Sequence, residues 1–145
     1  YGGALGDALG APHEFKFQKD VYTGRLEFPL TYRHRFMPAG KLIVGVVGQI
    51  TDDTEMTLCI LHSLVETKGC IDQNVLIRKY LQWANDPQTI FMGINTRKLL
   101  KGVTTVKGYE NRYDKMTDRE ANQSNGCLMR AAILAVAEKM TGDDH

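Results

Sequence analysis

One stretch decides the fold of this chain: Gly48-Gln49-Ile50-Thr51-Asp52-Asp53-Thr54-Glu55-Met56. Apolar residues continue after it at helical spacing until Gly69, which predicts a buried amphipathic helix over residues 51–68. Thr51 or Asp52 can serve as the N-cap of this helix. Glu55 lies three residues after Asp52, as in a capping box, so the start of the helix is well marked.

The oxygen-rich start of this helix has two interpretations. Acidic residues in a first turn commonly do no more than cap a helix and favour its dipole. Here, however, two adjacent carboxylates are flanked by two hydroxyls, and an apolar, glycine-punctuated run over residues 42–50 precedes them. Carboxylates at the end of a buried segment need a partner, a proton or a metal. Clustered hard oxygens suit Mg²⁺, Mn²⁺ or Ca²⁺ rather than zinc.

Other segments also show helical patterns. Residues 1–10 are rich in glycine and alanine, which suggests close backbone packing or approach to a ligand, and Pro12 ends this helix. For Asp7 and for Glu14, each considered alone, we favour a solvated position on the surface. We expect a further helix over residues 72–84, capped by Asp72. We also expect helices over residues 96–101 and 128–140, and a helical turn or loop around residues 109–116. Residues 17–40 predict a long loop with, at most, short strands.

The composition is that of a globular protein. Apolar residues make up 43% of the 145 residues, charged residues 24%, and the formal net charge is +1. This balance gives no excess of positive charge that would attract nucleic acid or an anionic membrane. No apolar run approaches the roughly 18 residues of a membrane helix, and no secretory signal is visible. Three widely spaced cysteines without zinc spacing indicate a reduced, cytoplasmic protein.

Four motifs in sequence carry a resemblance: GDALGAPHEF, GQITDDTEM, GINTRKLL and SNGCLMRAAILAV. In order and spacing they resemble the N-terminal half of the ADP-ribosylglycohydrolase family, the proteins related to dinitrogenase-reductase-activating glycohydrolase. The resemblance implies an all-α fold with a pair of Mg²⁺ or Mn²⁺ ions in a cleft that takes ADP-ribose. Residues 1–145 would be the N-terminal part of a single such domain, with the C-terminal part absent from this chain.

The resemblance also assigns roles to individual residues. Thr51, Asp52 and Asp53 match the family's metal ligands, and Glu14 matches an acid that lies beside the metals. The run from Ser124 through Asn125 to Gly126 matches a loop that touches the phosphates and ribose of ADP-ribose. Residues 93–97 match a helix start near the cleft, to which we assign no role.

The expected reaction is hydrolysis at the anomeric carbon of ADP-ribose. Its transition state should resemble an oxocarbenium ion. Metals in the site would orient ribose hydroxyls and lower the pKa of a bound water. Glu14 is the candidate general base, or else it controls access to the metals. Asp52 and Asp53 serve the reaction as ligands whose oxygens hold the cation, not as bases. The substrate would be an ADP-ribosylated protein or a small ADP-ribose conjugate.

One departure from the family leaves other functions open. The family supplies further metal ligands from an Asp-x-Asp-Thr-like motif in its C-terminal half, and nothing here matches it. The family also contains members that look non-catalytic, including lens-crystallin-like proteins. A non-catalytic ADP-ribose-binding or structural protein is therefore the main alternative. A metal-dependent phosphohydrolase is a weaker one, because it leaves the SNG and GDALGAP segments unexplained.

Overall fold

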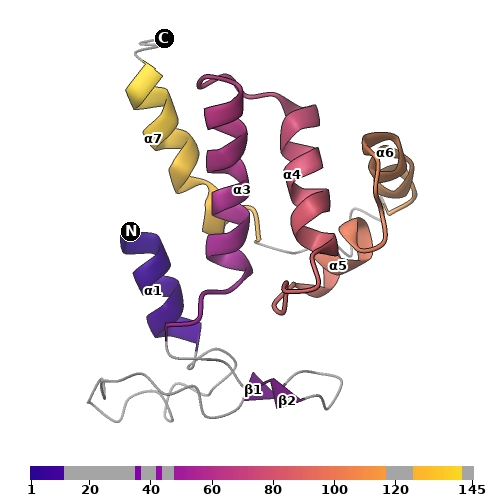
Figure 1. Cartoon of the computed structure of the whole chain (residues 1–145), viewed down its shortest axis with the longest axis horizontal. Coiled ribbons are helices and arrows are strands. Elements are labelled where there is room, and N and C mark those ends of the chain that lie inside the picture. The colour runs from indigo at the N-terminus through magenta and orange to yellow at the C-terminus, as the bar shows by residue number, and fades with distance from the viewer. Residues whose placement is uncertain (12–34, 37–41, 44–47, 117–125, 142–145) are drawn as a thin grey trace. The chain divides into compact units, whose positions relative to one another are not determined.

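The computed structural model describes residues 1–11, 35–36, 42–43, 48–116 and 126–141. The chain divides into two compact units, Tyr1–Thr51 and Asp52–His145. Helices dominate the described residues of both units (Figure 1). The predicted all-α fold is confirmed.

The first unit contains α1 (Gly2–Gly10) and a short antiparallel pair of strands, β1 (Arg35–Phe36) and β2 (Leu42–Ile43). The helix ends where the sequence predicted, at Gly10 with Ala11 as its C-cap. In the strand pair, Arg35 lies opposite Ile43 and Phe36 lies opposite Leu42. A Cβ atom added at any glycine of α1 would meet no other described atom within 4 Å. Among the described residues, the structure therefore gives no packing reason for the glycines of α1.

The second unit is built on α3 (Asp52–Glu66) and α4 (Gln73–Asn85), which pack side by side (Figure 1). Both match predicted helices. The buried residues of α3 recur three or four positions apart, so they lie on one face of the helix: Met56, Cys59, Ile60, Ser63 and Leu64. The chain leaves α3 through Lys68 and Gly69, both with positive φ, and the Gly69 N–H bonds to the Leu64 carbonyl at 2.7 Å.

The start of α4 is capped by a side chain. Asp72 Oδ1 accepts hydrogen bonds from the backbone N–H groups of Asn74 and Val75, at 2.8 and 3.0 Å. This is the cap that the sequence predicted at Asp72.

Two shorter helices follow, α5 (Ile94–Leu100) and α6 (Val106–Lys115). The segment around residues 109–116, predicted as a helical turn or loop, is thus part of a regular helix. Thr105 caps α6 by accepting a hydrogen bond from the Gly108 N–H. A buried cluster joins these helices to α4; its members are Leu81, Ala84, Met92, Leu100 and Val103.

The last predicted helix, residues 128–140, is interrupted. The structure has a 3-10 turn, η2 (Leu128–Arg130), followed by α7 (Ala132–Thr141). Both pack against α3 (Figure 1). The run Leu128 to Ala137 holds no glycine or proline, so local sequence carried no signal for this break. No helix in the described part of the chain is both long and apolar enough to cross a membrane.

Candidate active site

The oxygen-rich stretch lies where α3 begins. Thr51 is the last residue before the helix and is 2% exposed. Asp52 and Asp53 occupy the first turn, and both are half-buried. Carboxylates in a first turn are stabilised by the helix dipole, so this position suits two neighbouring acids.

Thr51 is held by Asp7 of α1, within the first unit. The Thr51 backbone N–H donates to Asp7 Oδ2 at 2.8 Å, and the Thr51 hydroxyl donates to Asp7 Oδ1 at 2.7 Å. Hydrogen bonds to a charged acceptor are stronger than neutral ones. The sequence analysis favoured a solvated surface position for Asp7, and that interpretation was wrong. Asp7 and Thr51 are 44 residues apart, and no local pattern announces their contact.

Asp52 is held by the start of α5, within the second unit. The Gly93 N–H donates to Asp52 Oδ2 at 3.0 Å. A Cβ atom at Gly93 would lie 3.8 Å from the same oxygen, which is ordinary contact. The segment 93–97, to which the sequence analysis assigned no role, therefore orients one of the predicted metal ligands.

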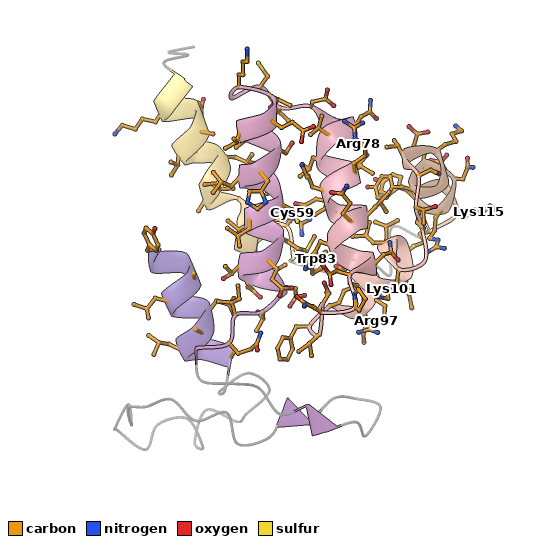
Figure 2. The ribbon with its side chains drawn as sticks, viewed as in Figure 1. Cys59, Arg78, Trp83, Arg97, Lys101 and Lys115 are labelled. Atoms are coloured by element: carbon orange, nitrogen blue, oxygen red, sulfur yellow. The ribbon has the colours of Figure 1, made fainter. Side chains whose placement is uncertain are left out.

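Glu55 joins α3 to α4. Its Oε2 accepts a hydrogen bond from the Trp83 indole N–H at 2.6 Å. Trp83 lies on α4 and packs against the buried cluster, as expected for a core tryptophan (Figure 2). The indole bond gives the acid of the predicted capping box a partner outside its own helix.

The residues after the predicted ADP-ribose loop are fastened to the same end of α3. Ser124 and Asn125 lie outside the described residues, while Gly126 is half-buried in the turn before η2. Arg130 donates from Nη1 to Met56 Sδ at 3.2 Å, and its guanidinium lies 5.4 Å from the centre of the Tyr80 ring. Met56 is one helical turn after Asp52, so the contact places Arg130 near the start of α3.

Burial also acts on Tyr80. It raises the pKa of the Tyr80 hydroxyl to about 12, an effect that the charge of Arg130 partly opposes. The phenol therefore stays protonated at neutral pH. The sequence analysis gave no role to Arg130, although it stands in the SNGCLMRAAILAV motif, and it did not single out Tyr80, which stands in no motif.

The side-chain oxygens at this site are of the type that a hard divalent cation prefers, but the described residues supply too few of them to enclose one. Thr51, Asp52 and Asp53 bring together a hydroxyl and two carboxylates, the oxygen ligands that Mg²⁺, Mn²⁺ and Ca²⁺ prefer. Neither at this site nor anywhere else among the described residues do three His, Cys, Asp or Glu side chains gather to hold a metal ion. Glu14, the third acid expected at the site, lies outside the described residues.

Comparison with known families matches residues 1–144 to the family described as ADP-ribosylglycohydrolase. The chain belongs to that family. It is 31% identical over 139 residues to the ADP-ribosyl-[dinitrogen reductase] glycohydrolase of Rhodospirillum rubrum, which covers 92% of this chain and 41% of the relative. It is also 35% identical over 88 residues to the uncharacterized protein YegU of Escherichia coli K12, 58% of this chain and 25% of that protein.

The chain thus spans less than half the length of these curated relatives. No solved structure matches it significantly. The predicted family is confirmed by the match over residues 1–144. The activity of the whole protein, its metals and its substrates stay predictions.

Proposed function

We propose that the complete protein is a metal-dependent hydrolase that removes ADP-ribose from a modified protein side chain or from a small ADP-ribose conjugate. The observation that carries the proposal is the placement of Thr51, Asp52 and Asp53 at the start of α3 in a chain of this family. The name of the Rhodospirillum rubrum relative supports a protein substrate. Free thiols at Cys59, Cys70 and Cys127 support a reducing, cytoplasmic location.

Thr51, Asp52 and Asp53 would hold Mg²⁺ or Mn²⁺ through their side-chain oxygens. When bound, such ions supply positive charge that orients ribose hydroxyls and activates water. Two ions are expected in the complete site, with the remaining oxygen ligands from the C-terminal part of the same protein.

The chemistry assigned to the chain is a substitution at the anomeric carbon. The bond between that carbon and the leaving nitrogen or oxygen breaks, and the electron pair stays with the leaving group. The oxygen of water forms the new bond, and Glu14 takes the proton that this water loses. The loop 124–126 would position the substrate through the phosphates and ribose of ADP-ribose.

Product analysis tests this function. The complete protein should release free ADP-ribose from an ADP-ribosylated protein or from O-acetyl-ADP-ribose when Mg²⁺ or Mn²⁺ is supplied. Asp52→Ala and Asp53→Ala should each weaken cation binding and nearly abolish turnover while circular dichroism stays unchanged. Asp72→Ala, which removes an acid that caps α4, is the matched control and should keep full activity. Normal turnover in both Asp52→Ala and Asp53→Ala would show that these two acids only cap α3.

The small number of donors among the described residues supports a second candidate, a non-catalytic ADP-ribose-binding protein. Binding of ADP-ribose without turnover in the complete protein would favour it. Release of AMP or phosphate would instead indicate a phosphohydrolase.

A further inference from the structure

Both carboxylate oxygens of Asp7 accept hydrogen bonds from Thr51. Oδ2 accepts from the Thr51 backbone N–H at 2.8 Å, and Oδ1 accepts from the Thr51 hydroxyl at 2.7 Å. The hydroxyl belongs to a residue that is 2% exposed, so water does not compete freely for it. The contact therefore fixes both the backbone and the side chain of Thr51.

The direction of the second bond decides what the hydroxyl can do next. A threonine hydroxyl has one proton and two lone pairs. Because Thr51 gives that proton to Asp7, its oxygen can meet any further group only as an acceptor. This is the state that a hydroxyl needs in order to ligate a cation, whose charge would repel a proton pointing toward it.

We propose that Asp7 is a positioning residue for the cation site, acting through Thr51. It holds the hydroxyl proton away from the cation and anchors the backbone at the point where the chain enters α3. The inference rests on the proposed function, because it needs Thr51 to be a metal ligand. Partners that orient metal ligands in this way typically contribute 10- to 100-fold to metal affinity.

Substitutions at both positions separate this role from a purely structural one. In Asp7→Asn, one carbonyl oxygen remains where two carboxylate oxygens accepted from the two donors of Thr51. An amide N–H₂ group replaces the second oxygen and cannot accept, so the Thr51 hydroxyl loses its fixed direction. Thr51→Val removes the hydroxyl with little change of shape, whereas Thr51→Ser retains it. The Asp7→Asn/Thr51→Val double variant completes the cycle.

The readout is the dissociation constant for Mn²⁺, measured on the complete protein by electron paramagnetic resonance of free Mn²⁺. Asp7→Asn and Thr51→Val should each weaken Mn²⁺ binding by roughly 10-fold or more. In the Thr51→Val background, Asp7→Asn should add less than about 2-fold, because its effect passes through the missing hydroxyl. Thr51→Ser should restore binding close to that of the unaltered protein.

Two controls keep the outcomes distinct. Asp72→Ala also removes a carboxylate that accepts two hydrogen bonds, so it should lower the thermal midpoint but leave Mn²⁺ binding unchanged. Asp52→Ala tests the cation site itself, and unchanged binding there overturns the proposed function. Weakened binding in Asp52→Ala together with unaltered binding in Asp7→Asn overturns the positioning role alone. If Asp7→Asn does not fold, unaltered Mn²⁺ binding by Thr51→Val overturns it equally.

Discussion

At the scale of single residues, Cys59 shows how the packing of α3 and α4 controls a reactive group. The side chain is 7% exposed, and its Sγ lies 3.8 Å from the Lys79 carbonyl oxygen on α4 (Figure 2). Burial raises the pKa of the Cys59 thiol to about 11; the negative charge of Glu55 adds to this, and Lys79 opposes it. Since the thiolate is the nucleophile, Cys59 should be the inert cysteine of this chain.

Alkylation with iodoacetamide at pH 8 should modify the exposed Cys70 and Cys127 and spare Cys59 until the protein is unfolded. Mass spectrometry of the labelled peptides measures this. Rapid labelling of Cys59 in the folded protein would show that the contact between α3 and α4 opens readily.

The same raised pKa predicts a pH dependence of stability. Between the ordinary thiol pKa of 9.0 and the folded value of about 11, the unfolded chain has lost this proton while the folded chain keeps it. The free energy of unfolding therefore falls as the pH rises through this window, by roughly 1–2 kcal/mol from this group. Urea denaturation at pH 8 and pH 10.5 measures the fall, and Cys59→Ala should reduce it.

At the scale of elements, Asn85 fastens the end of α4 to the turn that follows α5. Its Nδ2 donates to the carbonyls of Leu81 at 2.7 Å and Val103 at 2.8 Å, and its Oδ1 accepts from the Gly102 N–H at 2.8 Å. An amide is needed here, because the site presents acceptors on one side and a donor on the other. Gly102 has φ +76, a conformation that glycine adopts without strain.

Asn85→Asp should therefore destabilise the fold by about 2–3 kcal/mol, because it loses two donated bonds and turns a carboxylate toward two carbonyls. Asn74→Asp is the matched control: it makes the same change on the same helix at an exposed position, and we expect less than about 0.5 kcal/mol. Urea denaturation of both variants measures the difference. Equal losses would show that the three bonds of Asn85 contribute nothing specific.

These elements also show what sequence could and could not predict. Helices over residues 51–68 and 72–84 were predictable, because apolar spacing and the cap at Asp72 are local signals. The break at Ala131 was not, because nothing in that run disfavours a helix locally. The contacts that organise the candidate site were also out of reach. Asp7 bonds to a residue 44 positions away, and Gly93 to one 41 positions away, so only the folded chain brings them together.

At the scale of the whole molecule, the second unit exposes apolar side chains along α3, η2 and α7. Val65 is 71% exposed, Leu128 70% and Val136 51%. The matched relatives are more than twice as long as this chain, so their remaining residues are candidates to cover such surface. Among the described residues, too few oxygens converge at the candidate site to enclose a cation, so further ligands must come from elsewhere if the site holds one.

We therefore expect residues 1–145 alone to self-associate or dissolve poorly, to bind Mg²⁺ and Mn²⁺ weakly, and to lack hydrolase activity. Joining them to a C-terminal segment with an Asp-x-Asp-Thr-like motif should restore metal affinity and turnover together, because one event completes both the core and the ligand set. Light scattering, Mn²⁺ titration and an ADP-ribose release assay on both proteins measure this. Substituting the acids of the added motif with alanine separates the two effects, since it should preserve the monomer but lose the cation. If residues 1–145 alone are monomeric and fully active, the site is complete without any further segment.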